Sequence, residues 1–473
     1  VYNRIKELAP IVKKMAPFSI FLGGGGWSSY NPDEILKLIP ELDLICIGEG
    51  EETFSEIYDA IENNSNDFEN INGLCLRSEE KAIFTKPRAL IDDLNTVPYP
   101  AYHLLETDVY FAFSSLPYSV ESFNSKRRAS VVWERGCPRG CTFCSHNGMS
   151  RIDLQNIYGE GDRRAGEKLV RISDEENDTF QLPARWPSPA YAVENIEILH
   201  KNYNVDFISI VDENMTSNKK WTTEFCNLYK KSGLSDKVKW GTLGDAPSVA
   251  VKPELIQIMK DAGCAYISFG FESASDKVLN EDIQKGQTRL HLQKTLDTIL
   301  KAKLTPLTTF MIGNQHENIN DLMETMDFWI QNYAEIDPFI CTPYVGSPIY
   351  YNNKNRILSQ YDPKIKLIEE GKLKVDKETE SKWKLDALDM FMTDCGDAYQ
   401  YTATISEYFS IPELFAIKNL MYQKDSIRLL AWAHERYEET HEPQWKHDAK
   451  WAKYCNVCKA ESLMNELQIA HQI

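Results

Sequence analysis

The sequence contains no uninterrupted apolar run of the ~18–20 residues that a membrane-spanning helix requires. It also shows no secretory signal peptide. Basic residues are in deficit, since 52 Lys and Arg stand against 70 Asp and Glu, which gives a formal charge of −18. A chain this acidic argues against nucleic acid as a partner, because binding phosphate groups requires positive charge. We therefore expect a cytoplasmic protein without a transmembrane segment.

Disulfide bonds are not expected either, although the chain has 11 cysteines. An odd count fits a reducing compartment. Several cysteines stand singly in apolar or amphipathic segments, as buried thiols commonly do. These are Cys46, Cys75, Cys226, Cys264 and Cys341.

Three further cysteines behave differently, because Cys137, Cys141 and Cys144 fall within eight residues at C-x₃-C-x₂-C spacing. The apolar run 131–133 precedes them, which predicts a buried strand leading into a tight loop on which the thiolates converge. Three thiolates without an adjacent fourth indicate an iron–sulfur cluster with one iron left open. A structural zinc site normally has four protein ligands. His146 could complete such a site, but its closeness in the chain would strain a tetrahedron, so zinc is the minor alternative.

From 131 to 348 the sequence repeats strand and helix patterns, and polar residues follow several of the strands. Strands are expected at 131–133, 205–211, 238–243, 265–271, 305–312 and 338–343, with helices that include 219–231, 291–301 and 320–331. This order predicts an α/β fold, a partial (β/α)₆ barrel of the TIM type, whose site lies at the carboxyl ends of its strands. The remainder, 349–473, has helical patterns.

Residues 1–105 also alternate helix and strand, with strands expected at 18–22 and 42–47. A glycine-rich run, 23–26 or 48–50, follows each strand. In a parallel sheet, ligands gather at the carboxyl ends of the strands. Considered singly, each glycine run is more often a tight turn than a binding loop.

The cysteine spacing, with Phe143 directly before the last cysteine, resembles that of the radical S-adenosylmethionine (SAM) superfamily. The resemblance implies that the amino and carboxylate groups of SAM chelate the open iron of a [4Fe–4S] cluster. The reduced cluster then passes one electron to the sulfonium, and the resulting 5′-deoxyadenosyl radical takes a hydrogen atom from a small-molecule substrate. The resemblance also implies an electron donor such as flavodoxin or ferredoxin.

The strand ends extend this resemblance. Asp212 and Glu213 stand where the family approaches the methionyl amino group, and Gly-x-Glu-Ser at 270–273 matches a strand end near the ribose. At the turn 313–318, only Gly313 and Glu317 agree with the family pattern Gly-x-Pro-Gly-Glu-Thr. Taken alone, Asp212 is more often a helix N-cap. The SAM-binding residues implied are Phe143, Asp212, Glu213, Glu272, Ser273 and Gly313.

The two glycine runs, with the segment 31–34 between them, resemble the second half of the cobalamin-binding domain of one large branch of this family. The cobalamin-binding residues implied are Gly23, Gly24, Gly48, Glu49 and Gly50. The Asp-x-His-x-x-Gly motif of that domain has no match, and the first histidine is His103. Because the chain opens at Val1 within a helical pattern, we expect an N-terminal truncation that leaves only part of the pocket.

The resemblance implies four segments: a partial Rossmann-like cobalamin-binding domain (1–105), a linker (106–130), a radical SAM barrel (131–348) and a helical C-terminal domain (349–473). It implies methylation of an unactivated carbon with cobalamin as the expected activity. An oxidative cyclase or ring-rearranging enzyme of the same family is the alternative. Outside the enzymes, the alternative is a zinc-binding or redox-sensing scaffold.

Three features stay open. The long connection 145–188 is interpreted as a substrate lid. Aromatic and Met residues after 349 could line a pocket for a flat or hydrophobic substrate, although core packing is the favoured interpretation. The pair Cys455 and Cys458 could belong to a second metal site, but it lacks enough partners for a known ligand set.

Overall fold

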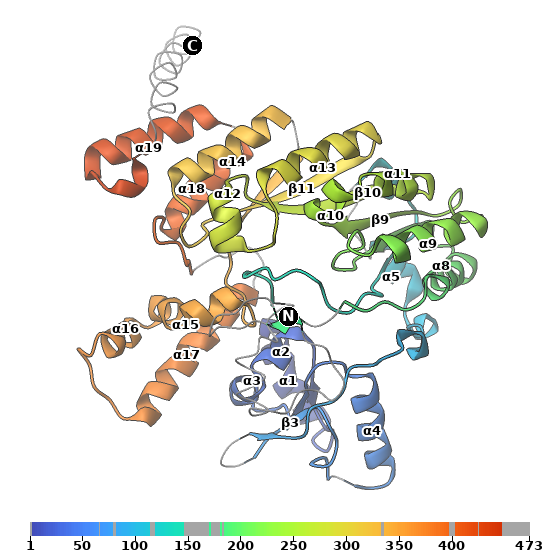
Figure 1. Ribbon diagram of the computed structural model, residues 1–473. Helices are drawn as coiled ribbons and strands as arrows, with labels where there is room; N and C mark the ends of the chain where they lie inside the picture. Colours follow the sequence, from blue (N-terminus) through green and yellow to red (C-terminus); the bar gives the residue numbers. More distant parts are fainter. Residues whose placement is uncertain are drawn as a thin grey trace, which may run out of the picture. The chain divides into compact units, whose positions relative to one another are not determined.

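The computed structural model describes residues 2–65, 67–78, 82–113, 119–145, 170–171, 180–181, 184–332, 335–396, 403–423 and 425–446. The chain forms two compact units (Figure 1). The first unit comprises 1–97, 136–185 and 342–405, and the barrel unit comprises 98–135, 186–341 and 406–473. In these described parts, no helix is both long and apolar enough to cross a membrane.

The barrel unit is built on a six-stranded sheet in the order β12-β11-β10-β9-β8-β5. Every neighbouring pair of strands is parallel. The strands are β5 (Arg128–Val131), β8 (Phe207–Ile210), β9 (Lys239–Gly244), β10 (Cys264–Glu272), β11 (Thr305–Ile312) and β12 (Glu335–Ile340). An open parallel sheet of six strands confirms the predicted partial barrel.

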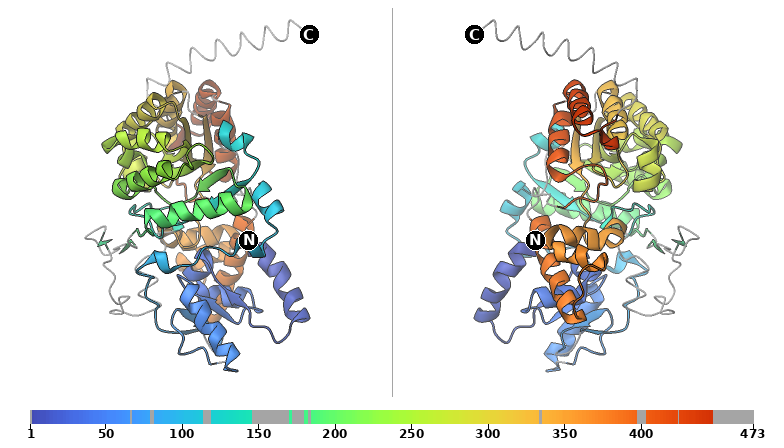
Figure 2. Two further views of the ribbon diagram at one scale, coloured as in Figure 1. Left: turned by 90° about the vertical axis from the view of Figure 1, so that its right-hand side faces the viewer. Right: turned by 90° about the vertical axis from the view of Figure 1, so that its left-hand side faces the viewer.

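Helices connect successive strands and lie together on one side of the sheet (Figures 1 and 2). They are α8 (Pro189–Tyr203), α9 (Lys219–Lys231), α10 (Ala246–Val251), α11 (Glu254–Asp261), α12 (Asp276–Val278), the π turn η4 (Leu279–Ile283), α13 (Arg289–Lys301) and α14 (Ile319–Asn332). Side-chain oxygens cap four of them: Ser188 caps α8, Asn218 caps α9, Thr288 caps α13 and Asn318 caps α14. Each cap satisfies a backbone N–H group that has no partner within its own helix.

The core between sheet and helices is aromatic, as expected where the strands of a parallel sheet are buried. Its largest fully buried side chains include Phe207, Phe225, Trp240, Phe269, Phe271 and Phe310. Gly241 of β9 leaves room for a neighbouring ring, since a Cβ atom at this position would lie 2.1 Å from Tyr266 Cε1. The close approach of β9 and β10 therefore depends on a glycine.

The first unit contains a small mixed sheet in the order β1-β2-β3-β4. Strands β1 (Leu22–Gly23) and β2 (Leu44–Cys46) are parallel, whereas β3 (Leu74–Leu76) and β4 (Ile83–Phe84) are antiparallel to their neighbours. Its first helices are α1 (Tyr2–Met15), α2 (Gly26–Tyr30), α3 (Pro32–Leu38) and α4 (Glu51–Glu62). Strands β6 (Val170–Arg171) and β7 (Phe180–Gln181) pair with each other.

The helical region after 341 belongs to both units. In the first unit, α15 (Pro348–Tyr361) and α16 (Pro363–Glu369) precede α17 (Lys377–Gly396), which packs on α1 and α3. In the barrel unit, α18 (Ile411–Tyr422) packs on β12 and α19 (Ser426–Thr440) packs on α14. Short turns complete the chain at η1 (Leu94–Thr96), η2 (Tyr102–Leu104) and η5 (Pro443–Trp445). The domain boundaries expected from the resemblance stay a prediction.

The expected strand at 18–22 is wrong at its start, because β1 begins only at Leu22 and Phe18 is 99% exposed. The backbone N–H of Phe21 donates to Asp43 Oδ2 at 2.7 Å, and the same oxygen pairs with Lys13 at 2.8 Å. A side chain therefore takes the amide that a longer strand would have used in its ladder.

Elsewhere the boundaries shift less. Helix α9 and strand β11 begin and end at the predicted residues, whereas the first barrel strand begins three residues before the predicted 131–133 and ends at Val131. The connector 106–130 contains two helices that were not predicted, α5 (Thr107–Phe113) and α6 (Val120–Asn124). Helix α10 was also not predicted, because its six residues are too few to show a helical period.

Candidate functional site

The cysteine loop, residues 136–145, follows β5 in the chain and lies in the first unit. It begins at Gly136 with a φ of +84°, a left-handed conformation that favours glycine. Cys141 is 6% exposed, whereas Cys137, Phe143 and Cys144 are half-buried. The backbone N–H of Cys144 donates to the carbonyl of Cys141 at 3.2 Å, which closes a tight turn.

The donor set of this loop suits a cluster with an open iron, because it offers three thiols on one turn. Within the described ranges, no three His, Cys, Asp or Glu side chains are arranged as a metal site. The three cysteines therefore stay a predicted ligand set. His146, most of the expected lid, and the pair Cys455 and Cys458 lie outside the described residues.

In the barrel unit, Asp212 follows β8 and is fully buried. Its Oδ1 accepts the backbone N–H groups of Trp133 at 2.6 Å and Glu134 at 3.0 Å. Asp212 thus joins the ends of β5 and β8, and the N-cap of the next helix is Asn218 instead. Loss of hydration raises the pKa of Asp212 to about 6. The two backbone hydrogen bonds lower this pKa, and the charge of the half-buried Glu213 beside it raises it further.

Glu134 is a buried carboxyl beside Asp212 that was not singled out from the sequence. Its Oε2 accepts the backbone N–H of Asn214 at 2.7 Å, and the residue is only 2% exposed. Burial raises the pKa of this carboxyl to about 8, and the charges of Asp212 and Glu213 act in the same direction. Among the described residues, its Oε1 has no hydrogen-bond partner. The sequence feature that could have pointed to Glu134 is its position as a single glutamate between an apolar strand and Cys137.

The end of β10 carries Glu272 with a φ of +61°, an unusual conformation for a residue other than glycine. Such backbone strain concentrates at functional sites. Glu272 Oε1 accepts a hydrogen bond from Lys285 Nζ at 2.9 Å, and both side chains are nearly buried. Lys285 also donates to the carbonyl of Gly270 at 2.7 Å. The adjacent Ser273 is fully buried, with its Oγ 3.1 Å from Thr325 Oγ1.

At the end of β11, the two residues that agree with the family turn bind each other. Gly313, with a φ of +80°, donates its N–H to Glu317 Oε2 at 2.7 Å. Asn314 donates its N–H to the same oxygen at 3.2 Å. Glu317 is fully buried, and loss of hydration raises its pKa to about 8. This carboxyl therefore shapes the turn from within.

His316 stands where the family turn has glycine, and the sequence alone assigned it no role. Its Nδ1 lies 2.6 Å from Asp282 Oδ1, and its backbone N–H donates to Asp282 Oδ2 at 3.1 Å. Asp282 belongs to the π turn η4, so this pair links the loops after β10 and β11. The imidazole side chain is 44% exposed.

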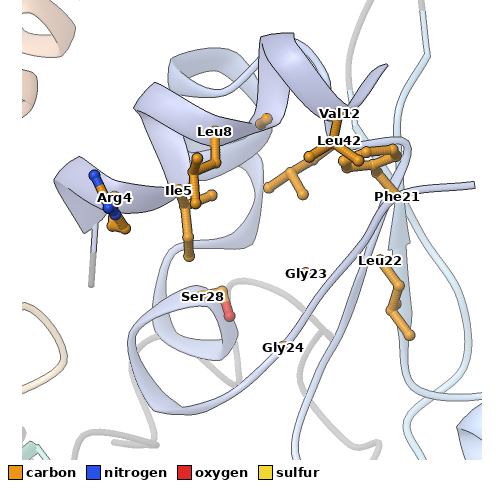
Figure 3. A pocket seen from close by; sticks show the side chains of 11 residues that line it. Arg4, Ile5, Leu8, Val12, Phe21, Leu22, Gly23, Gly24, Ser28 and Leu42 are labelled. Atoms are coloured by element: carbon orange, nitrogen blue, oxygen red, sulfur yellow. The ribbon is translucent and has the colours of Figure 1, made fainter. Parts of the chain in front are cut away.

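The first glycine run borders a cavity of about 290 Å³ in the first unit. Gly23, Gly24 and Ser28 line it on one side, and Ile5 and Leu8 point into it from α1 (Figure 3). A Cβ atom at Gly24 would meet nothing within 4 Å, so the backbone is open to a ligand here. The volume is at the low end for ligand pockets, which suits one part of a large cofactor.

The second glycine run is held by contacts within the protein. Gly48 donates its N–H to Ser29 Oγ at 3.2 Å. Glu49 Oε2 accepts the N–H of Ile91 at 2.8 Å, and its Oε1 pairs with Arg185 at 2.5 Å. Gly50 precedes α4. These bonds fix Glu49 as a support for the segment around Ile91, and its role toward a ligand stays a prediction.

Comparison with known proteins matches residues 131–328 to the Radical SAM superfamily. The chain is 29% identical over 358 residues to an uncharacterized methyltransferase of Pyrococcus horikoshii, covering 74% of this chain and 67% of that protein. It is 23% identical to the cytidylyl-2-hydroxyethylphosphonate methyltransferase of Streptomyces wedmorensis, covering 73% and 63%. It is 22% identical to the anaerobic magnesium-protoporphyrin IX monomethyl ester cyclase of a Synechocystis strain, covering 75% and 62%. The chain thus spans about two thirds of the length of these relatives.

Solved structures agree in fold. The radical SAM methyltransferase TsrM from Kitasatospora setae superposes with a TM-score of 0.53 at 14% identity, covering 75% of this chain and 62% of that protein. The cobalamin-dependent SAM radical enzyme OxsB superposes with a TM-score of 0.52 at 14% identity, covering 99% and 70%. The region 131–328 of the chain thus matches the radical SAM superfamily, whose enzymes use SAM and a [4Fe–4S] cluster.

Proposed function

We propose that Cys137, Cys141 and Cys144 hold a [4Fe–4S] cluster and that the protein methylates an unactivated carbon with the help of cobalamin. One observation carries this proposal: a loop with three cysteines follows the first strand of a six-stranded parallel half-barrel. When bound, the cluster and SAM supply a 5′-deoxyadenosyl radical that abstracts a hydrogen atom from the substrate. The protein itself supplies position and a dry environment.

The strand ends provide groups suited to hold SAM. Carboxylates at Asp212 and Glu213 would accept hydrogen bonds from its ammonium group, and Glu272 with Ser273 would orient the ribose and methionyl part. The turn at Gly313 would lie near the cofactor, and Phe143 would offer an aromatic face for the adenine. The buried, strained or hydrogen-bonded state of the strand-end residues limits their motion, which favours a preorganised site.

Cobalamin is proposed on two grounds. The cavity beside Gly23 and Gly24 leaves the backbone accessible, as close approach of a nucleotide tail would require. In addition, the structures that share this fold include TsrM with cobalamin and a [4Fe–4S] cluster bound and OxsB with aqua-cobalamin and SAM bound. Gly48, Glu49 and Gly50 form the second proposed contact.

A cyclase or ring-rearranging activity is the second candidate, because several relatives are named anaerobic magnesium-protoporphyrin IX monomethyl ester cyclase. Both candidates need a small-molecule substrate and an electron donor of the flavodoxin or ferredoxin kind. They separate by product: methylation leaves a methylated substrate, whereas cyclisation leaves a ring without added carbon.

Anaerobic reconstitution tests the cluster. The purified protein should take up about four iron and four sulfide per chain. It should also release 5′-deoxyadenosine when dithionite and SAM are added. Zinc in place of iron, with no nucleoside formed, would support a zinc-binding scaffold instead. Incubation with aquacobalamin followed by gel filtration tests whether a corrinoid is retained.

The variant Cys141→Ala should lose nucleoside formation, because it removes one of the three proposed ligands while deleting only one small buried side chain. Cys226→Ala is the matched control, since Cys226 is also buried but lies on α9 outside the loop. Anaerobic liquid chromatography measures the nucleoside. An unchanged yield in Cys141→Ala would exclude this residue as a ligand.

A further inference from the structure

The turn 344–347, between β12 and α15, lies directly against an aromatic ring of the N-terminal segment. Gly346 has a φ of +96°, and a Cβ atom on it would lie 2.1 Å from Tyr30 Cδ2. Tyr30 is itself 9% exposed and lies at the end of α2. This position thus requires glycine for two independent reasons, its backbone conformation and the close approach of the ring.

The turn continues rigidly into α15 through Ser347, which is fully buried. Its Oγ donates to the carbonyl of Tyr344 at 2.7 Å and accepts the backbone N–H of Tyr350 at 3.3 Å. The same side chain therefore closes the turn and caps the helix. A displacement at Gly346 must move the start of α15 with it.

The start of α15 in turn holds the cysteine loop. The backbone N–H of Ile349 donates to the carbonyl of Thr142 at 3.0 Å. Thr142 stands between Cys141, a proposed ligand, and Phe143, a proposed neighbour of the adenine. One backbone hydrogen bond thus connects the turn to the middle of the proposed cluster loop.

The residue before Tyr30 in α2 contacts both glycine runs. The neighbouring Ser29 donates its hydroxyl to the carbonyl of Gly25 at 2.9 Å and accepts the N–H of Gly48 at 3.2 Å. Helix α15 is fastened to the same region by two further contacts. Tyr351 donates its hydroxyl to Asn31 Oδ1 at 3.1 Å, and Lys354 pairs with Glu34 at 2.9 Å.

We propose that Tyr30 and the turn 344–347 form a positioning element for the cysteine loop. The ring of Tyr30 fixes the position of Gly346 by contact, and the start of α15 fixes the position of Thr142 through the hydrogen bond from Ile349. The inference rests on the proposed function, since it assumes that this loop binds the cluster. It assigns a role to residues outside the cysteine loop. Changes to groups that orient metal ligands typically cost about 10–100-fold in metal affinity or activity.

Gly346→Ala is the direct test, and Gly371→Ala is its control. Gly371 also has a positive φ, +69°, but a Cβ atom there would meet nothing within 4 Å. The control therefore carries the conformational cost without the clash. The rate at which a ferrous-iron chelator removes iron from the anaerobically reconstituted protein is measured. Gly346→Ala should lose iron about 10-fold faster than wild type, and Gly371→Ala should match wild type.

A double-variant cycle distinguishes positioning from general loss of stability. Tyr30→Ala removes the ring, so it should also speed iron loss, whereas Tyr30→Phe keeps the ring and should lose iron more slowly than Tyr30→Ala. Combining Tyr30→Ala with Gly346→Ala should add no further loss, because the new methyl group enters the space left by the ring. Electron paramagnetic resonance of the reduced cluster should show a weakened response to SAM in both single alanine variants.

The outcomes separate the two proposals. A wild-type protein that assembles no [4Fe–4S] cluster would overturn the proposed function. A wild-type cluster with equal iron loss and equal spectra in Gly346→Ala and Gly371→Ala would overturn the positioning role and leave the proposed function standing. If Gly346→Ala does not fold, judged by circular dichroism, Tyr30→Ala against Tyr30→Phe decides the question by the same two measurements.

Discussion

Replacing Glu134 with glutamine should change how the stability of the cluster-free protein depends on pH. In the folded chain, burial raises the pKa of Glu134 to about 8 from an ordinary value of 4.5. Between these two values the folded state keeps a proton that the unfolded state has released. Raising the pH through this window therefore lowers the free energy of unfolding, and above about pH 8 the full cost of a buried charge is present.

The magnitude follows from the same two values. At ~1.4 kcal/mol for each pH unit, ionising Glu134 in the folded state costs on the order of 5 kcal/mol. Glutamine cannot ionise, and its oxygen can still accept the N–H of Asn214. Its amide N–H groups lack a partner, which costs about 1–3 kcal/mol at every pH. The variant should be less stable than wild type near pH 5 and more stable near pH 8.

Urea unfolding followed by tryptophan fluorescence, repeated from about pH 5 to pH 8, measures this difference. Glu224→Gln is the matched control, because Glu224 is exposed on α9. Glu317 is also buried, and its pKa is also raised to about 8. The free energy of unfolding of Glu134→Gln will therefore still fall with pH, and the decisive quantity is the difference in this free energy between wild type and Glu134→Gln at each pH. Parallel profiles for wild type and Glu134→Gln would refute the reasoning.

Two further changes test the packing of the barrel unit. Gly241→Ala should lower the free energy of unfolding by about 1–3 kcal/mol, because the added methyl group meets the ring of Tyr266. Gly24→Ala is the control, since a Cβ atom there meets nothing within 4 Å and, as at Gly241, the φ is not positive; equal urea midpoints for the two variants would contradict the clash. Lys285→Met should cost about 3–5 kcal/mol by leaving the buried carboxylate of Glu272 without its cation, whereas combining it with Glu272→Gln should restore most of the loss. If the losses in free energy of unfolding of Lys285→Met and Glu272→Gln simply add in the double variant, this ion pair contributes little to stability.

The repeating part of the fold was readable from local pattern. Apolar runs of strand length alternate with amphipathic segments between 205 and 331, and the structure places β8 to β11 and the helices α9, α13 and α14 within a few residues of the predicted ranges. The predicted end of an element was wrong where a side chain from elsewhere in the chain took a backbone hydrogen bond. Asp43 takes the amide of Phe21 and shortens β1, an interaction that depends on a residue 22 positions away.

The candidate site divides in the same way. Cysteine spacing and the acidic strand ends were visible as motifs, because their chemistry lies in residue type and order. Glu134 and His316 were not assigned, since a single glutamate or histidine has no local signal. Their significance comes from burial in one case and from the carboxylate of Asp282 in the other. Glu49 shows the reverse: a motif residue whose side chain supports Ile91 and Arg185.

By itself, the order of residues determined the strand–helix alternation, the three-thiol loop and the polar ends of the barrel strands, because periodicity and spacing act over short stretches of chain. The tertiary structure alone decided which carboxyls lose their water, which glycines face a ring, and how Tyr30 reaches Gly346 across more than 300 residues. Burial and close contact depend on segments that meet only after folding, so no local pattern can encode them.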